Sequence, residues 1–181
     1  MESRGKAREK FSIDEACEIL ERTPKAVRAM VDGLSDGWTT GGNEENWAPF
    51  DIVGHLIHGE LTDWIPRAKI ILAQGENRTF EAFDRLAQFE LSKGRTLGEL
   101  LDEFDEFRAE NLKALRSWNL TQEPLQLRGI HPELGEVTMQ QLIATWVVHD
   151  LTHIRQLANV LARRYDETVG PWKEYLSILK G

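Results

Sequence analysis

Two histidines four residues apart lie within an apolar stretch near the end of the chain. The segment from Trp146 to Gln156 reads W-V-V-H-D-L-T-H-I-R-Q and carries His149 and His153. On an α-helix, residues i and i+4 lie one turn apart on the same face. Two neutral imidazoles so placed can each give a nitrogen lone pair to one metal ion. The spacing predicts either part of a metal site or two core histidines, since such pairs also occur on helix faces that simply pack.

A second pair of histidines lies in the segment D-I-V-G-H-L-I-H-G-E-L, as His55 and His58. When this segment is projected as a helix at about 100° per residue, its apolar arc is centred between Val53 and Leu56. His55 then falls on one rim of the arc and His58 toward the opposite rim. A rim position suits a metal site that solvent or substrate can reach. Periodicity alone does not choose between these two histidines.

The helices that must position these histidines are marked by three similar caps. In each, a serine or threonine is followed three residues later by glutamate or glutamine, and the two side chains can bond each other's backbone N–H groups. The caps predict helices that begin near residues 13, 97 and 139. The stripe after residue 97, which includes Leu100, Phe104 and Leu115, has the clearest helical period in the sequence. The helix that begins near residue 139 is expected to run to about Arg164.

Prolines interrupt two of the four predicted helices. Pro24 lies within the apolar pattern over residues 13–34, and we favour one helix kinked at this proline over two separate helices. The next helix is expected over residues 49–74, with a proline in its first turn. Pro66 should bend this helix or leave a carbonyl group unpaired.

Almost no stretch shows the alternation of a β-strand, so four long helices indicate an all-α four-helix bundle. We expect a single domain over residues 1–181, with residues 1–11 as a frayed start. Two connections of roughly twenty residues are longer than usual and permit neighbouring helices to run parallel. The first of them is expected to hold a short helical piece over residues 80–89. Gly170-Pro171 introduces a short C-terminal helix.

The composition excludes several classes of protein. The 181 residues include 41% apolar and 29% charged residues, as in ordinary folded proteins. A net charge of −8 disfavours nucleic acid and anionic membrane surfaces as partners. No apolar run approaches the length of a membrane span. Cys17 is the single cysteine, which excludes an intrachain disulfide, and with no signal sequence it predicts a cytoplasmic protein.

Three motifs, taken in order, resemble those of the DinB/YfiT family of helical-bundle metalloproteins. They are W-A-P-F-D-I-V-G-H-L at His55, H-P-E-L-G-E at His131 and H-D-L-T-H-I-R-Q at His149, and the likeness extends to Ala158. The resemblance implies a four-helix bundle, frequently a homodimer, with one divalent metal ion held by His55, His149 and His153. It also implies the chemistry of small-thiol S-transferases, maleylpyruvate-isomerase-like enzymes or metal-dependent hydrolases.

Three neutral imidazoles suit zinc or nickel, and they leave at least one coordination position for water or substrate. A metal so held can acidify a bound water or hold a thiol as its thiolate. We therefore predict a metal-dependent transferase or hydrolase that acts on a small molecule, with a low-molecular-weight thiol as one substrate, and we assign no catalytic residue. Two alternatives are a non-catalytic bundle that holds a metal, a ligand or a partner helix, with a stress-related role, and a structural bundle with packed histidines.

Four further residues are candidates for the surroundings of the metal. Glu60 and Asp150 project near the centre of apolar arcs, where a carboxylate is costly without a partner. Each is expected either to accept from an indole or pair with an arginine, or to orient a ligand imidazole. His131 is either a turn residue or a loop residue beside the substrate. Gln156, three residues after His153, either faces the site or extends the polar rim of the helix.

Overall fold

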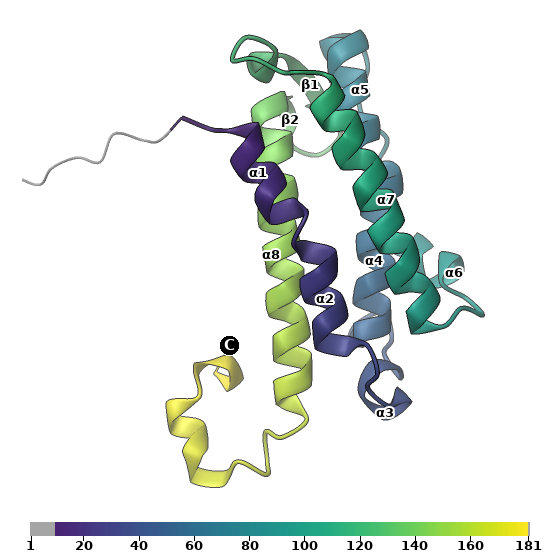
Figure 1. Ribbon diagram of the computed structural model, residues 1–181, viewed down its shortest axis with the longest axis vertical. Coiled ribbons are helices and arrows are strands. Elements are labelled where there is room, and N and C mark those ends of the chain that lie inside the picture. Colours follow the sequence, from purple (N-terminus) through teal and green to yellow (C-terminus); the bar gives the residue numbers. More distant parts are fainter. Residues whose placement is uncertain (1–9, 181) are drawn as a thin grey trace, which may run out of the picture.

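The computed structural model describes residues 10–180, and its long helices pack side by side as a bundle (Figure 1). Residues 1–9 of the predicted frayed start lie outside the described residues. The bundle has four arms, two of which are each divided into two helices: α1 (Ile13–Leu20) with α2 (Thr23–Val31), α4 (Pro49–Thr62) with α5 (Trp64–Ala73), α7 (Leu97–Ser117) and α8 (Met139–Arg163). This architecture confirms the predicted four-helix bundle.

Two neighbouring arms run parallel, as the long connections permit. Helices α4, α5 and α7 run toward one end of the bundle, whereas α1, α2 and α8 run away from it (Figure 1). The connection between α5 and α7 must therefore return along the whole bundle. It contains the short helices η1 (Gly75–Asn77) and α6 (Ala87–Leu91). The short helical piece was expected over residues 80–89, whereas α6 begins at Ala87, and Phe80 instead donates its N–H to the Ile130 carbonyl.

Two of the three predicted caps form with both reciprocal bonds, and the first forms with the serine bond alone. The Glu99 N–H donates to Thr96 Oγ1 at 3.2 Å, and the Thr96 N–H donates to Glu99 Oε2 at 2.7 Å. Thr138 and Gln141 exchange the same two bonds at 3.2 and 2.8 Å. At the first cap, the Ser12 hydroxyl oxygen accepts a backbone N–H at 3.3 Å. Helices α1, α7 and α8 therefore begin at the predicted residues.

Pro24 divides the first arm into two helices. Helix α1 ends at Leu20 and α2 begins at Thr23, so the prediction of one kinked helix over residues 13–34 is wrong. Proline has no N–H to donate and its ring displaces the carbonyl four residues earlier. The helical partner of the Leu20 carbonyl is therefore missing, and the chain restarts as α2 with the proline in its first turn.

Pro66 has the same effect on the second arm. Helix α4 ends at Thr62 and α5 begins at Trp64, with the proline again in the first turn. The break falls four residues before the proline, where the lost hydrogen bond would have lain. Both divided arms are thus interrupted near the middle of the bundle.

A short β-hairpin connects α7 to α8, in a segment for which no strand was predicted. Strand β1 (Arg128–His131) pairs antiparallel with β2 (Gly135–Thr138). Phe80, from the connection before α6, donates its N–H to the Ile130 carbonyl at 2.9 Å. Gly129 is required here, because a Cβ atom at this position would come within 2.7 Å of the Phe80 ring. Four-residue strands are too short for their alternation to stand out in a sequence.

The remaining short helices lie at the ends of the bundle. Helix α3 lies at the end opposite the hairpin (Figure 1). The short C-terminal helix predicted at Gly170-Pro171 is present as two 3-10 helices. The short helices at the ends of the bundle are α3 (Asp36–Thr39), η2 (Pro124–Gln126), η3 (Gly170–Tyr175) and η4 (Ser177–Leu179). No helix within residues 10–180 is long and apolar enough to cross a membrane.

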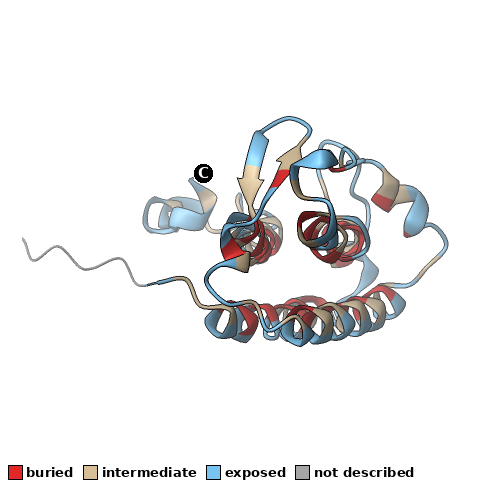
Figure 2. Cartoon of the chain, turned by 90° about the horizontal axis from the view of Figure 1, so that it is seen from above, coloured by how far each residue is buried: buried red, intermediate tan, exposed pale blue. Residues whose placement is uncertain are grey.

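The buried faces of the helices turn toward one another and form two apolar clusters (Figure 2). The hairpin-end cluster includes Leu20, Ile65, Leu115 and Ile143. The α3-end cluster includes Val27, Ile52, Leu100 and Leu157. Between them, three buried charged side chains occupy positions on α4, α7 and α8: Glu60, Arg108 and Asp150.

Candidate metal centre

Three imidazole nitrogens converge between α4 and α8. The Nε2 atom of His149 lies 3.1 Å from Nε2 of His55 and 3.1 Å from Nε2 of His153. One ligand atom from each of the three rings lies within 4.8 Å of the others. The i, i+4 pair on α8 therefore meets a histidine from α4, and the structure brings the three predicted ligands together.

Two glutamine side chains hold two of these rings from behind. The Nδ1 atom of His55 lies 2.9 Å from Oε1 of Gln88, and Nδ1 of His153 lies 2.7 Å from Oε1 of Gln156. An amide oxygen only accepts hydrogen bonds, so each Nδ1 carries the proton. The lone pair of each ring is thereby on Nε2, the atom that faces the common centre. The buried Nδ1 of His149 has no hydrogen-bond partner among the described residues.

This arrangement fits a divalent cation. Nε2 of His149 lies 3.1 Å from the Nε2 atoms of His55 and His153, and a cation between the three rings would be coordinated by all of them. In a tetrahedral zinc site with bonds of 2.0–2.1 Å, ligand nitrogens are about 3.3 Å apart. The observed separations are close to that value. The three histidines are therefore the residues of this chain that would hold the metal.

Burial keeps these imidazoles neutral. It lowers the pKa of His55 from 6.5 to about 4, with the nearby His153 as the next cause. The pKa of His149 is also lowered strongly, by burial and then by the two neighbouring histidines. For His153, burial again lowers the pKa, although its bond to Gln156 acts in the opposite direction. At neutral pH the lone pairs are therefore available to a metal rather than to protons.

Aromatic rings surround the three histidines. The Trp47 ring lies 4.8 Å from the His55 ring and stacks on His153 at 6.3 Å with an interplanar angle of 14°. Phe83 meets His55 edge-on at 5.4 Å, and Trp64 meets His149 edge-on at 5.0 Å. These apolar walls lower the local dielectric constant, which strengthens electrostatic interactions inside the centre.

His58 lies outside the cluster of ligand atoms. It is buried against the Phe83 ring, with the ring centroids 4.6 Å apart. Its two ring nitrogens have no hydrogen-bond partner of good geometry among the described residues. The structure therefore brings His55, rather than His58, to the two histidines of α8.

The two predicted carboxylates meet a buried arginine instead of a ligand imidazole. Arg108 donates to Glu60 Oε1 from Nη2 at 2.7 Å and to Asp150 Oδ2 from Nη1 at 2.6 Å. Trp146 Nε1 and Asn111 Nδ2 also donate to the Glu60 carboxylate, at 3.2 and 2.9 Å. No hydrogen bond among the described residues links either carboxylate to the three histidines. Their charges are thus satisfied within the bundle.

His131 is part of the hairpin turn. Its Nδ1 accepts the backbone N–H groups of Glu133 and Leu134 at 3.1 and 3.2 Å, and its ring meets Phe80 edge-on. The hairpin lies at the end of the bundle away from α3, whereas Gln156 is in direct contact with the ligand His153. Of these two candidates, the structure places only Gln156 beside the histidines.

Two residues of this region were not identified from the sequence. Gln88 lies on α6 in an otherwise irregular segment, so no pattern marks it. Arg108 had a detectable signal, because it is a charged residue on the apolar stripe of α7, between Phe104 and Leu112. A charge at such a position is expected to have a buried partner of opposite sign.

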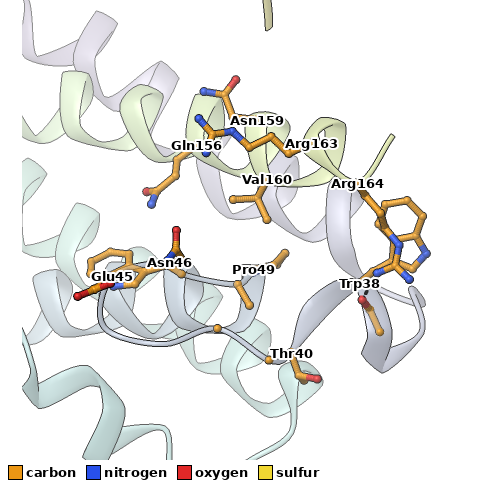
Figure 3. A pocket seen from close by; sticks show the side chains of 15 residues that line it. Trp38, Thr40, Glu45, Asn46, Pro49, Gln156, Asn159, Val160, Arg163 and Arg164 are labelled. Carbon is orange, nitrogen blue, oxygen red and sulfur yellow. Dashed lines mark hydrogen bonds between the residues drawn. The ribbon is translucent and has the colours of Figure 1, made fainter. Parts of the chain in front are cut away.

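A cleft of about 510 Å³ adjoins the centre at the α3 end. One wall is the segment of residues 37–49, which precedes and begins α4, and the other is the last part of α8 (Figure 3). Trp47 and Gln156 line this cleft and also contact the ligand histidines. The cleft and the three histidines therefore share two side chains, and the cleft is large enough for a small molecule.

These features define a class of protein, a helical bundle with parallel neighbouring arms and a group of three histidines that could hold a metal ion. The sequence pattern of the DinB superfamily matches residues 19–157, and the chain belongs to this superfamily. This family assignment agrees with the resemblance that the motifs indicated.

Two solved structures are similar to this fold. YfiT from Bacillus subtilis, described as a probable metal-dependent hydrolase with an unusual four-helix bundle topology, is 23% identical, with a TM-score of 0.74 over 88% of this chain and 93% of its own. TT2238, described as a four-helix bundle protein, is 22% identical, with a TM-score of 0.50 over 81% of this chain and 98% of its own. At these identities the likeness shows the shared fold. A search of the curated proteins gives no match.

Proposed function

We propose that this protein is a metal-dependent enzyme that transfers a small thiol to an electrophilic substrate. The observation that carries the proposal is the convergence of three Nε2 atoms, with the rings of His55 and His153 held by amide oxygens. Zinc or nickel suits such a set of nitrogen donors and accepts sulfur as a further ligand. A divalent ion held there supplies positive charge that favours the thiolate form of a thiol near neutral pH.

Thiol transfer is favoured over hydrolysis, because the two carboxylates of the buried cluster are not available as a base. Hydrolysis commonly needs a carboxylate or imidazole that takes a proton from the attacking water. In residues 10–180, the buried carboxylates near the centre, Glu60 and Asp150, are bonded to Arg108. A thiol loses its proton at a much lower pH than water, so its activation depends less on such a base. Metal-dependent hydrolysis, as described for YfiT, is the second candidate.

The transfer itself is a substitution. The thiolate sulfur forms a bond to the electrophilic carbon, the bond to the leaving group breaks, and that group departs with the bonding electron pair. The thiol proton passes to solvent. In this scheme His55, His149 and His153 hold the metal, and the rings of Trp47 and Phe83 limit the access of water. The open cleft beside Gln156 supports an enzyme over a closed metal-storage bundle.

The first test combines metal content with activity. Protein purified without a histidine tag should carry about one zinc or nickel ion per chain. The loaded protein should then accelerate the conjugation of glutathione, bacillithiol, mycothiol or cysteine to a chlorinated arene or an epoxide. Replacement of His153 by Ala should abolish the acceleration, whereas the matched control His58→Ala should retain most of it.

Other results would lead to other functions. Hydrolysis of simple esters without thiol conjugation would favour the hydrolase. If the protein keeps its metal and its fold but catalyses none of these reactions, a non-catalytic metal-binding bundle is favoured. The homodimer implied by the family resemblance stays a prediction, and analytical ultracentrifugation of the loaded protein tests it.

A further inference from the structure

We infer that the cleft beside the three histidines binds a protonated amine of the substrate, with the carboxylate of Glu45 as its ion-pair partner and the Trp47 ring as a neighbouring wall. This inference rests on the proposed thiol-transfer function and adds a class of substrate to it, a small thiol that carries an amine. The sulfur would reach a metal held by the histidines while the ammonium group lies in the cleft.

The wall of the cleft that carries Glu45 is fixed by its own backbone contacts. The Glu45 N–H donates to Oδ1 of Asn43 at 2.9 Å, which closes a tight turn. At the other end of this turn, the Ala48 N–H donates to Oδ2 of Asp51 at 2.8 Å. A Cβ atom at Gly42 would come within 1.9 Å of the same carboxylate oxygen, so the wall lies tightly against the start of α4. The backbone of Glu45 is therefore held at a defined place beside the cleft.

Glu45 is the acidic residue among those that line the cleft, and its carboxylate is available. Among the described residues it has no hydrogen bond or ion pair with another side chain, whereas both arginines of the lining are engaged. Arg164 packs on the Trp38 ring at 4.4 Å and donates to the Gly37 carbonyl. Arg163 also has an interaction partner. The charged group that the cleft offers to a ligand is therefore an anion.

The carboxylate lies at the end of the cleft that adjoins the histidines. In Figure 3, Glu45 and Gln156 lie toward one end of the cleft, and Arg164 lies at the other. Gln156 accepts the Nδ1 hydrogen of His153 at 2.7 Å, and Trp47, two residues after Glu45, stacks on the same imidazole. A ligand bound at this end therefore contacts side chains that also contact a metal ligand.

The chemistry of this end of the cleft favours an ammonium group over an alcohol or an acid. A carboxylate pairs with an ammonium group, and the face of an indole ring attracts the same cation. The net charge of −8 favours the approach of a cation to the chain as a whole. A metal at the histidines would repel an ammonium group that lies too close to the sulfur. The preference for an amine should therefore be weakest for the shortest thiols.

The experiment measures thiol binding without any turnover. Cobalt(II) replaces the resident metal, and the sulfur-to-cobalt charge-transfer absorption reports the coordination of each thiol. The probes are aminoethanethiol, aminohexanethiol and aminooctanethiol, each compared with the mercapto alcohol and the mercapto acid of the same length. The proteins are the wild type, Glu45→Gln, Glu45→Asp and the control Glu44→Gln, which changes the adjacent exposed glutamate outside the cleft lining.

We expect aminohexanethiol to bind about fivefold more tightly than mercaptohexanol in the wild type and in Glu44→Gln, the combined effect of one exposed ion pair and one aromatic contact. In Glu45→Gln the two thiols should differ by no more than about twofold, and Glu45→Asp should keep part of the preference. A rise in ionic strength should reduce the preference of the wild type, because salt screens an exposed ion pair.

The possible failures are distinguishable. Thiols that coordinate cobalt with no preference for the amine, or with a preference that Glu45→Gln leaves unchanged, overturn this inference and leave the proposed function standing. An equal loss of preference in Glu44→Gln also overturns it, since the effect would then belong to the charge of the whole chain. If no thiol of any kind alters the cobalt spectrum, thiol transfer itself fails, and the inference with it.

Discussion

The guanidinium of Arg108 donates a hydrogen bond to the carbonyl oxygen of Leu20 at 2.7 Å. This carbonyl has no helical partner, because Pro24 occupies the position four residues later and lacks an N–H. Arg108 also donates to Glu60 and Asp150, so α1, α4, α7 and α8 all meet at one buried side chain. The proline that divides the first arm thus provides an acceptor for the cation at the middle of the bundle.

Replacement of Arg108 by Met should destabilise the protein by about 3–5 kcal/mol, because it leaves two carboxylates buried without a cation. Both carboxylate side chains are fully buried, so water cannot replace the lost partner. Urea unfolding of the metal-free protein measures the effect. The triple variant Arg108→Met, Glu60→Gln, Asp150→Asn removes all three charges and should recover much of the lost stability. A loss of less than about 1 kcal/mol in the single variant would contradict this view of the cluster.

Replacement of His55 by Ala should weaken zinc binding about as much as replacement of His149, because each removes one of three ligands. His58→Ala is the matched control, since this histidine lies on the same helix but outside the cluster. Competition with a chromogenic chelator gives the three affinities. Equal losses for the His55 and His58 variants would mean that the third ligand is misassigned.

Replacement of Gln88 by Ala should lower metal affinity by about 10- to 100-fold without loss of the fold, since partners that orient a ligand imidazole commonly have effects of this size. The amide oxygen of Gln88 fixes the His55 tautomer with its lone pair on Nε2. The control is Gln126→Ala, which removes an exposed amide far from the centre. Zinc affinities of the two variants, together with their unfolding temperatures, separate a change at the centre from a general loss of stability. Affinities that do not differ would show that the tautomer is fixed in another way.

The metal-free protein should lose stability as the pH falls from about 6.5 toward 4. In the unfolded chain His55 takes up a proton near its ordinary pKa of 6.5, whereas in the folded chain burial lowers this pKa to about 4. Between these values the unfolded state binds more protons, so the free energy of unfolding decreases as the pH decreases. Urea midpoints at several pH values measure the slope for wild type and His55→Gln. The variant should show the smaller slope, and identical slopes would contradict the assigned shift.

Much of the helical framework follows from local chemistry. The caps at Thr96 and Thr138 begin helices because the required side chains lie within three residues of one another. The effect of Pro24 was harder to predict, because it depends on whether another group donates a hydrogen bond to the Leu20 carbonyl, which the proline leaves without its helical donor. Arg108 supplies that group from a helix almost 90 residues away, as their separation of 88 positions shows. Local sequence contains no information on this contact.

The candidate centre was predictable in its ligands but not in its supports. A helical projection shows that His55 and His58 lie on opposite rims of the apolar arc of their helix. Which of the two can be a ligand depends on which rim faces α8, and this is set by tertiary packing. The resemblance to a family resolved this choice, and the periodicity did not. Gln88 was not predictable at all, because the parallel arms force its connection back along the bundle and so bring it to His55.

The charged residues Glu60, Arg108 and Asp150 divide the apolar core into the hairpin-end cluster and the α3-end cluster. The breaks before Pro24 and Pro66 fall near the same level, so only α7 and α8 cross it as continuous helices. The two halves are therefore suited to open as separate cooperative units in native-state hydrogen exchange. Because His55 and His153 lie on the α3 side of this level and His149 lies at it, the binding free energy of a metal would raise the cost of opening that half directly. Amide protons of the hairpin half would then exchange through global unfolding only to the extent that α7 and α8 couple the opening of the two halves.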